Sequence, residues 1–344
     1  MSGGRNLPEA VLKVIESGAI AEFATVSAAG VPIDTPVYYF PSDDLTTLDV
    51  ATGLSYPAKA ERARRNPKVG MLVEGRPGEP VVSVRGRAAV RDSNLEANAV
   101  RYLAETGFEG ISFGVPWSQA RNAVWYWTRM IIEVMPERIM WWDNAAAMNG
   151  PPQIWNAPAD QVYPTSDPAP PGKVSPAAEW KQRPWQEIAA DGFARNVQPH
   201  LTLCDEDGYP LPIRALSCEL IGDRFKLQLP AGAPWKGGGK ATLTFIGLET
   251  FVGDATVDGN TIWLTVERAL PQHPLMQDPA EVLRPSDAVR TKLLARLEEE
   301  VRRRGQSIPK IPESLPEPTR IALVRRQSFG TSAPLAEGTN LPGS

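Results

Sequence analysis

Residues 45–75 read LTTLDVATGLSYPAKAERARRNPKVGMLVEG, two apolar segments on either side of a cationic one. The first segment, 45–53, has the composition of a strand and ends at Gly53. The middle segment, from about residue 57 to 65, is rich in Ala, Lys, Glu and Arg and predicts a helix, which Asn66-Pro67 ends. Five cations therefore lie directly before the next strand: Lys59, Arg62, Arg64, Arg65 and Lys68.

These cations stand out because the chain of 344 residues is slightly acidic, with a formal net charge of −4 and a pI near 5.5. A general nucleic-acid binder would carry a broad basic face, so the charge balance argues against nucleic acid as a partner. A local basic cluster instead indicates a local anionic partner. A phosphorylated small molecule fits, since Lys and Arg donate charge-assisted hydrogen bonds to phosphate.

The composition, with 42% hydrophobic and 22% charged residues, is that of a globular protein, and the length favours two domains. No apolar run reaches the roughly 18–20 residues of a membrane-spanning helix, and the N-terminus lacks the apolar core of a secretory signal. Only two cysteines occur, Cys204 and Cys218, which favours reduced residues. We therefore expect a cytoplasmic protein with no membrane partner.

Outward from the opening stretch, the first half of the chain is rich in predicted strands. Two runs around a turn at 28–30 precede it, and residues 68–75, 79–92 and 129–142 continue the β pattern. Helices are predicted at 8–18, 93–107 and 116–128. Nine prolines in residues 146–184 then predict a semi-rigid linker.

After this linker the first half recurs. DEDGYPLPIRALSCEL (205–220) matches SAAGVPIDTPVYYFPS, KATLTFIG matches KVGMLVEG, and TFVGDATVDG matches VSVRGRAAVRD. The interval between matching glycines is 12 residues shorter in the second copy, and the missing residues fall on the cationic helix. The sequence therefore predicts a tandem duplication with these parts: a first β domain (1–145), the linker (146–184), a degenerate second β domain (185–275), a C-terminal helix and tail (276–330), and a disordered end (331–344).

The ordered set of a Gly-x-Pro turn, a strand ending in a hydroxyl residue, a Lys-and-Arg helix closed by Asn-Pro, and a strand with a central Gly resembles the pyridoxamine 5′-phosphate oxidase-like family. The resemblance covers roughly residues 20–142 and, more faintly, 199–272. It implies a mainly β fold of two split barrels. The pairing that two chains make in the family would here be an internal pseudo-dimer, with the flavin between the halves.

Carried onto this sequence, the family pattern implies Thr52, Ser55 and Lys59 at the FMN phosphate, and the segment Thr35-Pro36-Val37-Tyr38 along the flavin ring. Many members have Asn where this chain has Arg62, so a different phosphorylated cofactor is also open. Charge alone adds Arg62 and Arg65 as phosphate contacts. Trp142, at the end of a predicted strand, is a candidate border of the cofactor cleft.

The resemblance implies an FMN-dependent oxidoreductase that acts on a small organic substrate, although no catalytic acid or base stands out. Three strand arginines are candidates to stabilise a reduced flavin: Arg85, Arg87 and Arg129. Two alternatives stay open: a related enzyme that uses deazaflavin F420 or haem, and a non-catalytic module that binds a ligand or partner. His200 is a candidate haem ligand, but two histidines are too few for a metal cage. A homodimer is possible, and the internal pseudo-dimer makes it unnecessary.

Overall fold

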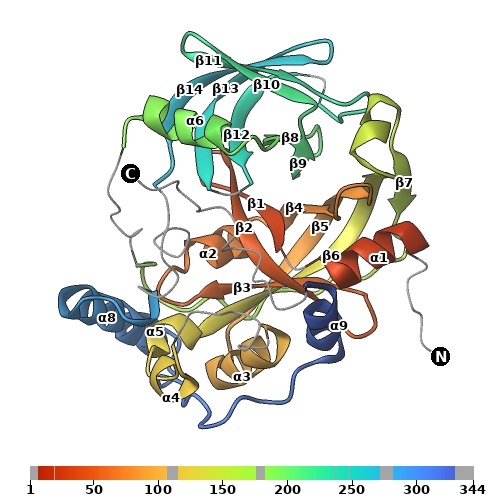
Figure 1. Cartoon of the computed structure of the whole chain (residues 1–344). Coiled ribbons are helices and arrows are strands. Elements are labelled where there is room, and N and C mark those ends of the chain that lie inside the picture. Colours follow the sequence, from red (N-terminus) through yellow and green to blue (C-terminus); the bar gives the residue numbers. More distant parts are fainter. Residues whose placement is uncertain are drawn as a thin grey trace.

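The computed structural model describes residues 7–18, 20–106, 115–175, 183–235, 237–246, 248–271 and 282–329, with side chains up to residue 325. The fold is mainly β, as the sequence predicts. Two seven-stranded sheets form two halves, one from each part of the chain, and helices surround the first of them (Figure 1).

The first sheet contains a closed barrel. Its strands follow the order β3-β2-β1-β4-β5-β6-β7, and β3 also pairs with β6, so that six strands close on themselves. The strands are β1 (Ile20–Val26), β2 (Pro32–Pro41), β3 (Leu48–Gly53), β4 (Lys68–Glu74), β5 (Val81–Arg91), β6 (Arg129–Trp142) and β7 (Gln153–Asn156). Apolar residues of alternating positions, among them Phe23, Tyr39 and Val50, fill the barrel with no exposed surface.

The second sheet repeats this order as a curled, open half-barrel, β10-β11-β14-β13-β12-β8-β9. The two orders correspond when β9 and β10 together stand for β2. In the first half β2 pairs with both β1 and β3, whereas here β9 pairs with β8 and β10 pairs with β11. The strands are β8 (His200–Cys204), β9 (Pro210–Arg214), β10 (Ser217–Ile221), β11 (Arg224–Gln228), β12 (Gly239–Phe245), β13 (Glu249–Asp258) and β14 (Thr261–Ala269).

The two halves also share an irregularity. The pairing of β5 with β6 shifts register at Arg85/Gly86, and that of β13 with β14 shifts at Val252/Gly253. A Cβ on Gly86 would lie 2.8 Å from Val134 Cγ1, and one on Gly253 would lie 2.0 Å from the Thr265 carbonyl oxygen. Glycine is therefore required at both bulges. The sequence repeat thus has its counterpart in strand order and in a matching β-bulge.

The helices lie mostly against the first half (Figure 1). The predictions at 8–18 and 93–107 correspond to α1 (Glu9–Ser17) and α3 (Leu95–Thr106), and the cationic helix is α2 (Ala58–Arg65). The predicted helix at 116–128 is two short ones, α4 (Trp117–Ala120) and α5 (Val124–Trp127). The remaining helical elements are η2 (Ala145–Asn149), α6 (Trp185–Ala194), α8 (Asp287–Arg303) and α9 (Arg320–Phe329). Among the described residues, no helix lies between β11 and β12, where the second copy is shorter.

The proline-rich segment packs on the first barrel where it is described. Its strand β7 pairs with β6 at the edge of the sheet. Further along, the Ser166 hydroxyl accepts a hydrogen bond from the Val90 N–H (3.0 Å), and Asp167 accepts from the Asp92 N–H (2.9 Å). The segment is therefore held against the barrel by backbone contacts. Residues 176–182 of this segment, and the predicted disordered end at 331–344, lie outside the described residues.

The two halves pair inside one chain through an interface with approximate two-fold symmetry. Strand β4 packs against β9, and the corresponding β12 packs against β2. A Cβ on Gly70 would lie 1.8 Å from the Pro210 carbonyl oxygen, and the Thr242 hydroxyl donates to the Pro32 carbonyl. Gly70 corresponds to Thr242, and Pro32 to Pro210, in the two copies, so one contact is the symmetry counterpart of the other. The predicted internal pseudo-dimer is present.

Candidate cofactor site between the two halves

Helix α2 places its cations at the end of strand β1. Ala60 and Ala63 are fully buried against the barrel, and Arg62 and Arg65 face β1. Arg62 is half-buried, and its Nε donates to Thr25 Oγ1 (2.8 Å). Arg65 is exposed, and its guanidinium donates to the Val26 carbonyl (3.1 Å). Arg62 is therefore enclosed by the fold, whereas Arg65 lies at its edge.

Lys59 is a half-buried cation that makes no hydrogen bond or ion pair with any described residue. Burial, and after it the neighbouring Arg62, lower the pKa of Lys59 to about 7, although the carboxyl groups of Asp34 and Glu22 act in the opposite direction. Asp34 is in turn hydrogen-bonded to Thr202 of the second half (2.7 Å).

Two further unpaired polar groups lie beside Lys59. Ser55 is fully buried and its hydroxyl has no hydrogen-bond partner, while its carbonyl accepts from Arg296 of α8 (2.9 and 3.0 Å). Arg129 lies between the rings of Tyr102 and Tyr126, 4.3 and 4.2 Å from their centroids, and its buried Nε has no partner. Arg129 also lowers the pKa of Lys59. We call Ser55, Lys59, Arg62 and Arg129 the first-half site.

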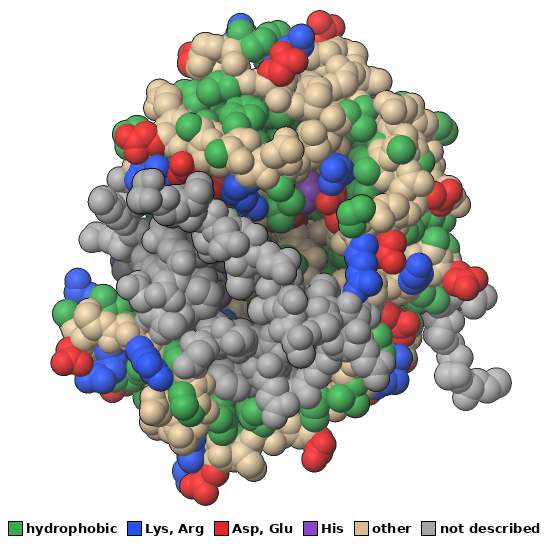
Figure 2. All heavy atoms as spheres, in the orientation of Figure 1, with side chains coloured by type: hydrophobic (Ala, Val, Ile, Leu, Met, Phe, Trp, Pro, Cys, Tyr) green, Lys and Arg blue, Asp and Glu red, His purple; other side chains and the backbone are tan. Residues whose placement is uncertain are grey.

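A buried acidic pair borders this site. Burial together with the adjacent Glu22 carboxylate raises the pKa of Asp34 to about 8, so Asp34 carries a proton at neutral pH. Figure 2 shows a hollow in the surface where the two halves meet, with both basic and acidic side chains near it.

The residues predicted to lie along a flavin ring occupy β2. The Thr35 hydroxyl is buried and has no hydrogen-bond partner. Tyr38 is half-buried against the core of the first half, and burial together with Tyr102 raises its pKa to about 12. Pro36 faces Glu22 on β1. Val37 packs in the core of the first barrel, so its side chain does not reach the interface.

Of two other predicted residues, Thr52 lies next to the first-half site and Trp142 lies away from it. Thr52 is 7% exposed and pairs with Met130, next to Arg129, at the end of β3 where the prediction places it. Trp142 stands at the opposite end of β6 from Arg129, and its indole N–H donates to the Gly150 carbonyl (3.0 Å). Its ring packs with the core of the second half, so the structure does not bring Trp142 together with the phosphate candidates.

The remaining candidates, His200 and Arg85, lie at two different places in the fold. Burial lowers the pKa of His200, but Glu74 and Glu22 raise it more, to about 10. A protonated imidazole has no lone pair for a haem iron, which argues against a ligand role. Arg85 is bound to Glu137 and Asp207 (both 2.7 Å), away from the first-half site. Among the described residues, no group of three or more His, Cys, Asp or Glu is placed to hold a metal ion.

Sequence reasoning missed part of this site. Arg129 was a candidate only for a reduced flavin, yet the structure brings it to the phosphate candidates, because β6 begins where β3 ends. Arg296, which holds the Ser55 carbonyl, was not a candidate at all, because it lies 241 residues away in the sequence. The rings of Tyr102 and Tyr126 were also not predicted. A pattern search limited to one element cannot find such partners.

Comparisons with known proteins give structural matches only. No protein-family model and no curated protein sequence matches the chain. One match is general stress protein 26 of Bacillus anthracis (18% identity, 43% of this chain and 97% of that one, TM-score 0.29). A second is a pyridoxamine 5′-phosphate oxidase-related, FMN-binding protein of Nostoc punctiforme (13% identity, 46% of this chain and 96% of that one, TM-score 0.34). A third is an FAD-binding protein of Mesorhizobium loti (22% identity, 38% of this chain and 89% of that one, TM-score 0.28). The Nostoc description names the family that this sequence resembles, while the fold assignment rests on the strand order of the chain itself.

No helix in the described part of the chain is long and apolar enough to cross a membrane. Both cysteines, Cys204 and Cys218, are free thiols.

Proposed function

We propose that the first-half site holds the phosphate of FMN and that the protein is an FMN-dependent oxidoreductase acting on a small organic substrate. One observation carries this proposal. Ser55 and Lys59 follow the end of β3, and Arg129 pairs with Gly53 at that same end. The Ser55 hydroxyl, the Lys59 ammonium and the Arg129 Nε have no partner in the described part of the chain. Buried polar groups without partners are costly, so such a group of donors favours an anion.

A phosphate monoester suits these donors. It carries nearly two negative charges at neutral pH, and each shielded charge-assisted hydrogen bond contributes about 1.5–3 kcal/mol. Lys59 supplies a point charge, Arg129 a planar guanidinium and Ser55 a hydroxyl donor. Arg62, already fixed by Thr25, adds further positive charge. Three donors with these strengths bind a phosphorylated cofactor tightly without a basic surface elsewhere.

The flavin, when bound, supplies the electron transfer. The protein's own residues hold and enclose the cofactor. Arg296 fixes the Ser55 carbonyl and thereby orients its hydroxyl, and the two tyrosine rings fix Arg129. Asp34, protonated at neutral pH, keeps a proton at the interface beside Thr202. We propose that the two halves arose by internal duplication and that only the first half kept the phosphate helix.

Arg62 also favours a second candidate, deazaflavin F420. Many family members have Asn at this position, whereas this chain has a cation, with exposed Arg65 one helical turn further along. F420 carries carboxylates in addition to its phosphodiester, and these need more cations along the helix. The free thiols accord with a reducing compartment, so we propose a cytoplasmic location. The substrate is proposed only as a small organic molecule.

The first experiment is the visible spectrum of the protein purified without added cofactor, followed by titration with FMN. We expect flavin bands, and we expect Lys59→Ala to weaken FMN binding at least about tenfold, since one shielded charge-assisted contact is lost. Lys240→Ala is the control, because Lys240 is a half-exposed lysine of the second half that pairs with Asp254 and Glu267. Equal FMN affinity in Lys59→Ala and the unmodified protein would remove the phosphate role.

Other spectra would identify the alternatives. Deazaflavin absorption with no FMN binding would favour F420, and a single intense haem band would favour haem. A colourless protein that also fails to bind added FMN would favour a non-catalytic module.

A further inference from the structure

Two buried carboxyl groups lie next to each other on the first barrel, Glu22 on β1 and Asp34 on β2. In the register of these strands Glu22 lies opposite Pro36, and Asp34 is two positions from Pro36, so the two carboxyl side chains are diagonal neighbours on one face of the sheet. Glu22 is 3% exposed and Asp34 has no exposed surface. Two carboxylates this close together and this deeply buried cannot both be ionised without a large electrostatic cost. We call Glu22 and Asp34 the carboxyl pair.

Each member of the carboxyl pair has one oxygen that lacks a donor. Thr202 Oγ1 donates to Asp34 Oδ2 at 2.7 Å, while Asp34 Oδ1 is buried without a hydrogen-bond partner. His200 Nδ1 lies 3.5 Å from Glu22 Oε1, while Glu22 Oε2 is buried without a partner. Ionised carboxylates only accept hydrogen bonds, whereas a carboxyl group that keeps its proton also donates one. One proton held between Glu22 and Asp34 therefore supplies the missing donor.

The other charged groups around the carboxyl pair do not replace this proton. His200 on β8 lies 3.3 Å from Glu74 on β4, and Glu74 is bound by Arg214 on β9 at 2.7 Å. With one proton on the pair, its single negative charge is matched by His200, and Glu74 is matched by Arg214. A further cation is Lys59 on α2, which interacts with both carboxyl groups. Burial is the main cause that lowers the pKa of Lys59 to about 7, so above that pH Lys59 does not compensate a second carboxylate.

We propose that Glu22 and Asp34 share one proton and make the contact between the two halves dependent on pH. While the pair holds the proton, Asp34 bonds Thr202 and Glu22 faces His200, so β1 and β2 of the first half are joined to β8 of the second. When the proton passes to the solvent at higher pH, two carboxylates repel each other inside the interface and weaken this contact. Burial together with repulsion from Glu22 raises the pKa of Asp34 to about 8, which places this loss just above neutral pH.

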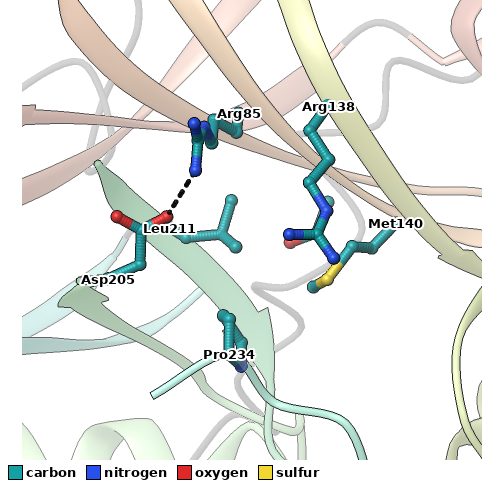
Figure 3. A pocket seen from close by; sticks show the side chains of 7 residues that line it. Arg85, Arg138, Met140, Asp205, Leu211 and Pro234 are labelled. Atoms are coloured by element: carbon teal, nitrogen blue, oxygen red, sulfur yellow. Dashed lines mark hydrogen bonds and ion pairs between the residues drawn. The ribbon is translucent and has the colours of Figure 1, made fainter. Parts of the chain in front are cut away.

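The pH dependence of the carboxyl pair has the opposite sign to that of Glu74 in the same interface. A carboxyl group whose pKa is higher in the folded than in the unfolded chain contributes stability that is fully present below its ordinary pKa of 3.8 and is lost as the pH rises through about 8. Elsewhere in the interface, Arg85 of β5 bonds Asp205 of the second half at 3.3 Å (Figure 3). An arginine stays charged throughout this range, so that contact is independent of pH. Asp205 therefore provides a matched control.

Asp34→Asn is the first test, because an amide accepts from Thr202 and donates to Glu22 but does not ionise. The measurement is urea denaturation of the full chain between about pH 5 and 9. We expect the unfolding equilibrium constant of the unmodified protein, divided by that of Asp34→Asn, to rise by up to about tenfold per pH unit and to level off above about pH 8. The corresponding ratio for Asp205→Asn should stay constant over the same range. A ratio for Asp34→Asn that is also constant with pH would overturn the proposal.

A second readout uses the unmodified protein and therefore does not require a variant to fold. A protonated carboxyl group has an infrared band separate from that of a carboxylate, and we expect this band to be present at neutral pH and lost as the pH passes about 8. In Glu22→Gln the second carboxylate is absent, so Asp34 should ionise at least about one pH unit lower. If no such band is lost between about pH 7 and 9, or if it is lost at the same pH in Glu22→Gln, the two groups do not share a proton.

Discussion

Lys59 and Arg64 lie on the same short helix, yet their surroundings differ in a way that decides their roles. Arg64 is ion-paired with Asp92 (2.7 Å) and Glu61 (3.5 Å), whereas Lys59 has no such partner among the described residues. The Arg64 side chain is only 8% exposed. A paired cation supports the fold, and an unpaired one beside a buried hydroxyl is available to a ligand.

The lowered pKa of Lys59 makes FMN affinity depend on pH. Phosphate binds the protonated lysine, and the free protein loses that proton as the pH rises through about 7. Binding raises the pKa of Lys59, so affinity should fall above pH 7 by up to about tenfold per pH unit. The measurement is the FMN dissociation constant between neutral and moderately alkaline pH.

Lys59→Arg is the matched variant for this prediction. A guanidinium stays charged through this pH range, so the variant should keep nearly constant FMN affinity where the unmodified protein loses it. If both proteins lose affinity in parallel, Lys59 is not the titrating group.

At the scale of elements, helix α8 shows that an apolar pattern predicts a helix but does not predict the partners of its charged residues. Its apolar spacing predicts the helix at 286–305, and the structure has it at Asp287–Arg303. The pattern gives no partner for the cations at the end of the helix. In the structure the Arg304 side chain is 2% exposed and bonds Glu300, Asp92 and Glu61 at 2.6, 2.8 and 3.2 Å. Glu300 lies on α8 itself, whereas Asp92 and Glu61 belong to the first half, and Glu61 is on α2, so buried charge links the end of α8 to α2.

Arg304→Met tests this role. Removing the cation leaves three carboxylates close together with little access to water, and breaking a buried ion pair from one side costs about 3–5 kcal/mol. We expect the free energy of unfolding, measured by urea denaturation, to fall by that order. Arg302→Met is the control, because Arg302 is exposed on the same helical turn. A loss no larger than the control's would mean that the buried ion pairs contribute no net stability.

The strands of the first half were predictable because each carries its own local pattern. The prediction for 129–142 coincides with β6, and 45–53 contains β3. The sequence does not predict that β9 and β10 are separate strands. Ala215, Leu216 and the segment SCEL (217–220) continue the apolar pattern of β9. Strand β7, inside a proline-rich segment, depends on the free edge of β6. Within the candidate site, Lys59 and Ser55 follow from the resemblance, whereas Arg129 and Arg296 follow only from the folded arrangement.

At the scale of the whole molecule, a charged cluster joins the halves. Arg214 bonds both oxygens of Glu74 (2.8 and 2.7 Å), and His200 lies 3.3 Å from the same carboxylate. Burial raises the pKa of Glu74, but His200 and Arg214 lower it more, to about 2. Glu74 belongs to the first half and both partners to the second, so its charge holds the two barrels in register.

The pH range of this contribution follows from the two pKa shifts. Stability from Glu74 is fully present above its ordinary pKa of 4.5 and is lost as the pH falls toward 2. Stability from His200 is fully present below 6.5 and is lost as the pH rises through about 10. The cluster should therefore contribute most between about pH 4.5 and 6.5.

Glu74→Gln removes the shared carboxylate and leaves two cations facing each other at the interface. We expect the free energy of unfolding to fall by about 3–5 kcal/mol near pH 6, because a buried pair is broken from one side. The difference from the unmodified protein should shrink toward pH 2, where Glu74 is protonated, and toward pH 10, where His200 is neutral. Urea denaturation at several pH values measures this, with the half-exposed Glu267→Gln as control. A difference that is constant with pH would show that the halves are held together by their apolar contacts and not by this cluster.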